Sequence, residues 1–175
     1  MDQNALELML DEHAIRKVLE LYTRGVDRLD AELVSSVYWP DSHDDHGAYK
    51  GPGQEFGPFV AEALKKGAAA TEHSLNQSLI EIDGNRARAE TYFVAYHRRE
   101  EVETYLDIFG GRYMDVLEKR GEEWRLLDRK VIWEWSKTEK IKGSHYDPSA
   151  FEHGKRDKRD PAYDQSWRSS DYKPG

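Results

Sequence analysis

The sequence predicts an α+β domain in which three helices pack on one face of a curved antiparallel sheet. In the first third of the chain, apolar residues recur at three- and four-residue steps, as on one face of a helix. Beyond about residue 70 they alternate instead, as in half-buried strands. Asp83-Gly84-Asn85, between two such runs, is typical of a hairpin turn. Helices followed by long strands favour a layered α+β architecture.

The helices have recognisable boundaries. The first covers about residues 4–25, and Gly25 indicates a break before Asp27. Its apolar face is Leu10, Ala14, Val18 and either Leu21 or Tyr22. Asp30 is suited to cap a short second helix, which Pro40 prevents from continuing. A polar loop is expected over residues 41–53, and then a third helix over residues 57–66 with Pro58 in its first turn.

The strands follow in order. A hairpin covers residues 73–98, a third strand covers 104–119, and a fourth covers 124–137. Gly110-Gly111 interrupts the third strand and predicts a bulge. On the fourth strand, one parity carries Leu127, Arg129, Val131, Trp133 and Trp135.

Composition limits the class of protein. The 175 residues suit one domain, here residues 1–140, followed by a polar arm or lid over residues 141–175. A net charge of −8 argues against a nucleic-acid partner. No apolar run is long enough for a membrane span, and we expect a cytoplasmic protein. Because the chain has no cysteine, it has no disulfide framework and no thiolate nucleophile.

Four polar residues at apolar positions are candidates for catalysis: Tyr22, Asp27, His73 and Arg129. Each also has a structural interpretation, such as a helix-end carboxylate, a buried histidine or a structural ion pair. Together they make chemical sense. A carboxylate bonded to an imidazole gives a general base, while a tyrosine hydroxyl and a guanidinium can assist a leaving group.

The segments YTRGVDRLD, EHSLNQSLIEIDGNRARAETYF and GGRYMDVLEKRGEEWRLLDRKVIWEW resemble the SnoaL-like family of the NTF2-like superfamily. The resemblance implies a cone of bent sheet wrapped by three helices around a deep apolar pocket. It extends to the scytalone and bile-acid 7α-dehydratases and the hexachlorocyclohexane dehydrochlorinases of this family. It implies that Asp27 and His73 form the base, with Tyr22 and Arg129 at further catalytic positions. Where the bile-acid enzymes place a second acid, this chain has Tyr96 beside His97.

The function expected from residues and resemblance together is that of a cofactor-free lyase. It would remove a proton through Asp27 and His73 and expel water, halide or formaldehyde from a hydrophobic, aromatic or alicyclic substrate. The substrate-binding candidates are Trp39, Phe56, Phe59, Tyr96, His97, Tyr113 and Trp133. Two alternatives stay open: a non-catalytic ligand-binding or partner-supporting subunit, and an isomerase that uses the same base.

Three further expectations concern metals, assembly and the arm. His43 and His46 lie among acidic residues at short spacing, but a solvated loop is favoured over a metal site there. A sheet covered on one face by helices favours a homo-oligomer, a trimer or a dimer, through its other face. The arm carries bulky side chains that are expected to anchor it over the pocket or a neighbouring subunit: Ile141, Tyr146, Phe151, Tyr163 and Trp167.

Overall fold

The computed structural model describes residues 3–143 and 147–170. Its helices are α1 (Gln3–Asp27), α2 (Ala31–Ser36) and α3 (Gly53–Gly67). Its strands are β1 (Tyr38–Asp45), β2 (Lys50–Pro52), β3 (Ala70–Asp83), β4 (Arg86–Glu100), β5 (Thr104–Arg120) and β6 (Glu123–Lys140). They form one sheet in the order β2-β1-β6-β5-β4-β3. The predicted α+β class is confirmed.

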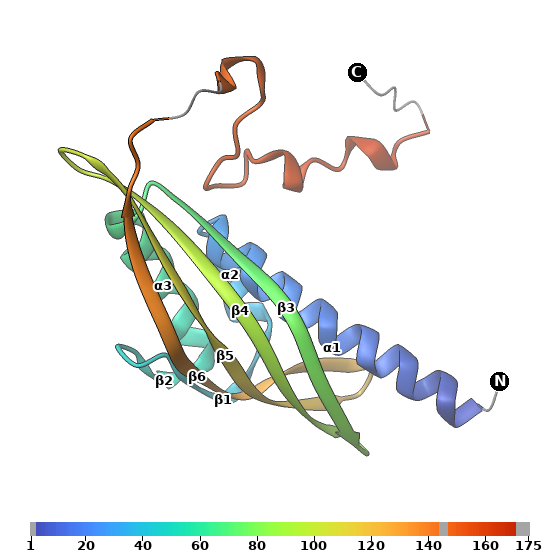
Figure 1. The fold of residues 1–175 in the computed structure, drawn as a ribbon. Helices are drawn as coiled ribbons and strands as arrows, with labels where there is room; N and C mark the ends of the chain where they lie inside the picture. The colour runs from blue at the N-terminus through green and yellow to red at the C-terminus, as the bar shows by residue number, and fades with distance from the viewer. Residues whose placement is uncertain (1–2, 144–146, 171–175) are drawn as a thin grey trace.

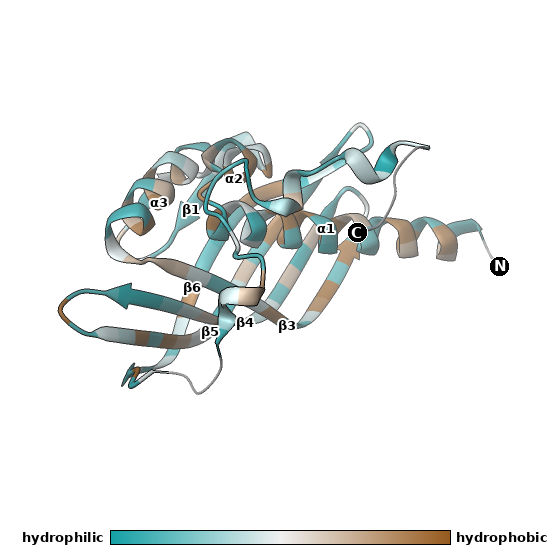
Figure 2. Ribbon diagram, turned by 90° about the horizontal axis from the view of Figure 1, so that it is seen from above, coloured by the Kyte–Doolittle hydropathy of each residue, from teal (hydrophilic) through white to brown (hydrophobic). Residues whose placement is uncertain are grey.

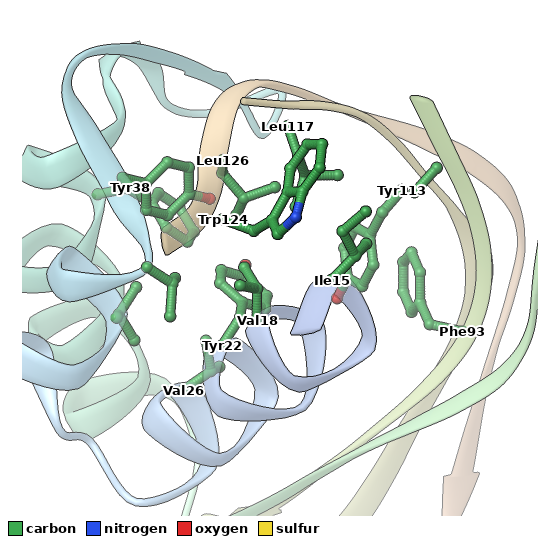
Figure 3. Packing of buried hydrophobic residues seen from close by; sticks show 14 of the residues in the cluster. Ile15, Val18, Tyr22, Val26, Tyr38, Phe93, Tyr113, Leu117, Trp124 and Leu126 are labelled. Atoms are coloured by element: carbon green, nitrogen blue, oxygen red, sulfur yellow. The ribbon is translucent and has the colours of Figure 1, made fainter. Parts of the chain in front are cut away.

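The sheet bends round α1 to form a cone, and α2 and α3 close one side of it (Figure 1). Apolar and polar residues alternate along the strands, so each strand turns one set of side chains toward the helices (Figure 2). The core lies between α1 and the inner face of the sheet (Figure 3). Ile15, Val18, Tyr22 and Val26 of α1 pack there, whereas Leu10 is exposed.

The sequence indicated a break in α1 at Gly25, but the helix runs on to Asp27. Gly25 serves close packing instead, because a Cβ there would lie 2.7 Å from a methyl carbon of Val34 on α2. Five residues of unbroken helix amount to a rotation of about 140°. Tyr22 and Asp27 therefore point to different parts of the cone.

The predicted loop over residues 41–53 is wrong. Most of this segment belongs to β1 and β2, and β1 pairs with β6 in parallel and with β2 in antiparallel register. Ser42 and Asp44 are the inward residues of β1, and both are buried. Because these inward side chains are polar, the strand lacks the apolar alternation that would have revealed it.

Helix α3 begins at Gly53, four residues before its predicted start, so Pro58 lies inside the helix and not in its first turn. Proline cannot donate the hydrogen bond that the Gln54 carbonyl would receive. The Ser35 hydroxyl of α2 donates to that carbonyl instead, at 2.6 Å. This bond lets the helix tolerate the proline.

The predicted bulge at Gly110-Gly111 is confirmed, and a second irregularity lies between Val116 and Leu117. Each irregularity adds one residue to β6. The residues of β6 that were predicted to share one parity therefore do not all lie on the same face. Trp135 pairs with Gly110 and lies on the face opposite Trp133. Any side chain at Gly110 would collide with the Trp135 ring, since a Cβ would come within 2.4 Å of it.

After β6 the arm contains three short 3-10 helices, Pro148–Ala150, Pro161–Tyr163 and Ser166–Arg168. It turns back toward the ends of α1 and β3 (Figure 1). Tyr163 contacts the domain, donating to Asp30 at 2.8 Å, whereas Phe151 and Trp167 are largely exposed. Tyr146 lies outside the described residues. No helix in the described part of the chain is long and apolar enough to cross a membrane.

Candidate active site

Asp27 and His73 form a hydrogen-bonded pair where the C-terminal end of α1 meets the start of β3. His73 Nδ1 lies 2.7 Å from Asp27 Oδ1, and the backbone N–H of His73 donates to Asp27 Oδ2 at 3.0 Å. The contact predicted from the sequence is therefore present. Both oxygens of the Asp27 carboxylate are hydrogen-bonded to His73, and this fixes the imidazole against the end of the helix.

The electrostatics of the pair favour a charged carboxylate. Burial alone would raise the pKa of Asp27, but the hydrogen bonds and charge of His73 outweigh it, and the pKa lies below its ordinary 3.8. An ionised carboxylate accepts hydrogen bonds only, so His73 Nδ1 carries the proton. When the imidazole is neutral, the Nε2 atom holds the lone pair that a general base requires.

A row of aromatic rings begins at this pair and crosses four neighbouring strands. The rings of His73 on β3 and His97 on β4 lie 5.4 Å apart. His97 meets Phe109 on β5 edge to face at 4.6 Å, and Phe109 stacks on Trp133 of β6 at 5.2 Å. Trp133 is 61% exposed, so the row runs from the buried pair to the surface. We call His73, His97, Phe109 and Trp133 the aromatic row.

His97 is neutral at ordinary pH. Burial and the nearby charge of His73 lower its pKa from 6.5 to about 4. Its Nε2 atom is buried and has no hydrogen-bond partner among the described residues.

Two of the seven predicted binding residues, His97 and Trp133, belong to the aromatic row. The sequence analysis missed Phe109, although it lies on the parity of Tyr113 just before the glycine pair. The other five lie elsewhere. Phe56 and Tyr113 fill the core, Phe59 is partly exposed against Tyr49, Trp39 bonds to the Glu118 carbonyl, and Tyr96 alternates onto the face opposite His97.

Arg129 and Tyr22 form a cluster separate from the Asp27–His73 pair. Arg129 is fully buried and binds Asp115 through two hydrogen bonds of 2.7 Å. Its guanidinium carbon lies 4.1 Å from the centre of the Tyr22 ring and 4.2 Å from that of Tyr113. This ion pair, held between aromatic faces, links α1, β5 and β6 inside the core. The structure thus joins the four predicted catalytic residues as two pairs.

A second carboxylate–imidazole pair, which the sequence analysis placed in a solvated loop, lies beside this cluster. His46 Nδ1 is 2.7 Å from Oδ1 of the fully buried Asp44, and His46 Nε2 is 3.1 Å from the Tyr22 hydroxyl. The Tyr38 hydroxyl donates to Asp44 at 2.5 Å. The His46 ring stacks on Phe56 at 4.2 Å.

This arrangement also bears on the metal site considered for residues 41–46. Asp44 and His46 bind each other, while His43 faces outward near Asp128. Over residues 3–143 and 147–170, no three histidine or carboxylate side chains gather in a way that could hold a metal ion.

The bent sheet wrapped by helices is an NTF2-like fold, and the carboxylate–imidazole pair lies at the end of its first helix. Residues 7–130 match the model of the SnoaL-like domain, and the chain belongs to this family.

Solved structures with the same fold include enzymes. Hexachlorocyclohexane dehydrochlorinase LinA type 2 superposes with a TM-score of 0.71 at 16% identity, over 84% of this chain and 99% of that one. A scytalone dehydratase-like protein from Novosphingobium aromaticivorans gives 0.65 at 17%, over 83% and 97%. LinA type 3 from Novosphingobium barchaimii gives 0.68 at 14%, over 82% and 99%. No curated protein sequence matches significantly.

Proposed function

We propose that this protein is a cofactor-free lyase in which His73, held by Asp27, removes a proton from a hydrophobic substrate that lies along the aromatic row. The observation that carries the proposal is the 2.7 Å bond between His73 Nδ1 and Asp27, which makes Nε2, beside that row, the lone-pair atom of the neutral imidazole. The dehydratase and dehydrochlorinase neighbours support it as enzymes of the same fold.

The proposed reaction is an elimination. The Nε2 atom of His73 takes a proton from a carbon atom of the substrate. The electron pair of the C–H bond forms a double bond, and the leaving group departs from the adjacent carbon with its own bonding pair. Asp27 stays ionised and stabilises the imidazolium that results.

The substrate class follows from the surroundings of the base. Phe109 and Trp133 offer ring faces suited to an aromatic or alicyclic compound. A leaving oxygen would depart as water, and a halogen as halide. In a retro-aldol variant, the base would take a hydroxyl proton, and the oxygen would form the C=O bond of formaldehyde as the C–C bond breaks. The electron pair of that C–C bond would form a C=C bond, and the leaving group on the next carbon would depart with its own bonding pair. An isomerase, which returns the proton to another carbon, needs the same base and is the alternative.

A substrate panel tests the proposal. Aryl-propane diols, haloalicyclic compounds and hydroxysteroids would be incubated with the protein, and released halide, formaldehyde or new conjugated absorbance would be measured. We expect turnover of at least one class, and a loss of at least 1,000-fold in His73→Ala and Asp27→Asn. The control is His43→Ala, whose imidazole is half exposed on β1 and should leave turnover unchanged.

Turnover that persists in His73→Ala would overturn the proposal. A product that is only rearranged, with nothing released, would favour the isomerase. Ligand binding along the row without any turnover would favour the binding subunit.

A further inference from the structure

We propose that Arg156 of the arm, together with His97, binds a carboxylate group of the substrate beside the Asp27–His73 pair. This inference rests on the proposed function and narrows its substrate to an aromatic or alicyclic acid. Three observations support it: the position of the arm, the atoms of Arg156 and His97 that have no described hydrogen-bond partner, and the charged side chains around them.

The arm brings Arg156 to the junction of α3 and β3. Its Nη1 atom donates to the Leu64 carbonyl at 3.2 Å and also to the Ala68 carbonyl. Ala68 lies three residues before Thr71, whose partner across the strands is His97. The guanidinium is thus held by backbone carbonyls at the end of the sheet where the aromatic row begins.

One side of the Arg156 guanidinium is hydrogen-bonded to the protein and the other side is not. The Nε and Nη2 atoms of Arg156 are buried and have no hydrogen-bond partner among the described residues. They lie on one edge of the planar group, which is the edge that binds the two oxygens of a carboxylate. A buried N–H group without an acceptor destabilises the folded state. A ligand carboxylate would remove this cost.

Charge points to the same ligand. Two other cations that hold the arm are neutralised: Arg28 binds Asp160 at 2.9 Å, and Lys158 binds Asp30. A third, Arg24, donates to the Ala162 carbonyl and lies over the Tyr163 ring. Arg156 makes no ion pair with a described carboxylate, and burial lowers its pKa. The nearby Asp27 is already occupied on both oxygens by His73. The charge of Asp27 acts on Arg156 from nearby, but the Nε and Nη2 atoms of Arg156 stay open to an acceptor from outside.

His97 completes the site. Its buried Nε2 has no described partner, and the neutral ring can offer either a donor or an acceptor. Arg156 is among the charges that hold the pKa of His97 low. An anion bound between the two would offset that charge, so the His97 pKa should rise when it binds. A substrate whose acid lies here would extend its ring over Phe109 and Trp133.

Binding of matched acids and amides tests the inference. The probes are benzoate, phenylacetate and 3-phenylpropanoate, each compared with its neutral amide by titration calorimetry. We expect at least one acid to bind at least tenfold more tightly than its amide. Arg156→Gln should remove this preference, while Arg156→Lys should keep part of it because the charge is retained.

The control is Arg159→Gln. Arg159 belongs to the same arm, but its side chain is 81% exposed and pairs with its neighbour Asp157. This change should leave the preference intact. In addition, the NMR titration of His97 should move upward from a pKa of about 4 when the acid is present.

Equal binding of acids and amides by the unaltered protein would overturn the inference, as would no binding of either. An unchanged preference in Arg156→Gln would overturn it too. These outcomes are separable from failure of the lyase proposal. Acids that bind through Arg156 without any turnover refute only the lyase, and turnover of neutral substrates that is unaffected by Arg156→Gln refutes only the carboxylate site.

Discussion

Asp44 and His46, two residues apart on the chain, form a carboxylate–imidazole pair inside the protein, and Asp44 is completely buried there. Its second oxygen accepts from the Tyr38 hydroxyl, so one carboxylate holds two donors. Through His46 it also positions the Tyr22 hydroxyl, whose ring lies against Arg129. The polar core of this protein is organised around that carboxylate.

We predict that Asp44→Ala lowers the free energy of unfolding by about 3 kcal/mol, because Tyr38 and His46 lose their acceptor in a buried setting. Urea unfolding at neutral pH measures the change. The matched control is Asp45→Ala on the same strand, where the lost pair with Lys50 lies near the surface and should cost much less. Equal effects of the two changes would contradict the network.

The low pKa of His97 predicts a pH dependence of stability. The unfolded chain binds a proton at this residue below its ordinary pKa of 6.5, whereas the folded protein does so only below about 4. Unfolding therefore takes up a proton between these values, and stability should fall as the pH drops from 6.5 to 4. The groups that act on the ring are His73, Asp27, Asp107 and Arg156.

His97→Gln should flatten this part of the profile, measured by urea unfolding at pH 4.5, 5.5 and 7. The lowered pKa of Asp27 has the same sign but acts below its ordinary 3.8, so it lies outside this window. A profile of His97→Gln that is as steep as that of the unaltered protein would refute the assignment.

Truncation after Lys140 tests whether the arm is a lid. We predict that the domain stays folded, because the contacts of the arm with it are mainly polar and near the surface. Ligand affinity and turnover should fall at least tenfold, since Arg156 is removed and the site opens to water. Far-UV circular dichroism verifies folding. Unchanged affinity, turnover and mass would identify the segment as a tail.

We also expect a homo-oligomer. The outer face of the sheet carries Tyr92, Val94 and Trp135 around a hollow, and Met9 and Leu10 of α1 are exposed. Sedimentation at micromolar concentration should give a mass of two or three times 20.4 kDa. Trp135→Lys should lower it, while Trp167→Lys on the arm should not. A mass near 20.4 kDa for the unaltered protein would contradict the expectation.

The sequence predicted the fold class, the hairpin and the glycine bulge because each depends on a local pattern of hydropathy or turn residues. It also predicted the Asp27–His73 bond, which the resemblance to the family implied. It missed β1 because the inward residues Ser42 and Asp44 are polar and are buried through specific partners that no local pattern reveals.

The separation of Tyr22 from Asp27 was missed for a related reason. Glycine in a helix indicates either an end or a close contact, and only the position of Val34 decides which. The bulge at Gly110-Gly111 likewise places Trp135 on the outer face, while Trp133 belongs to the aromatic row. Arg156 gave no signal at all, because an arginine in a polar tail looks the same whether it is solvated or docked.

Asp30 divides its two oxygens between two tasks. Oδ1 caps α2 by accepting from the backbone N–H of Leu33 at 3.1 Å, and Oδ2 receives Tyr163 at 2.8 Å and Lys158 from the arm. Releasing the arm would return Oδ2 to solvent and leave the Oδ1 bond to the helix in place. The arm can therefore come away from the domain as a separate piece, while the wall that carries Val34 and Gly25 keeps its shape.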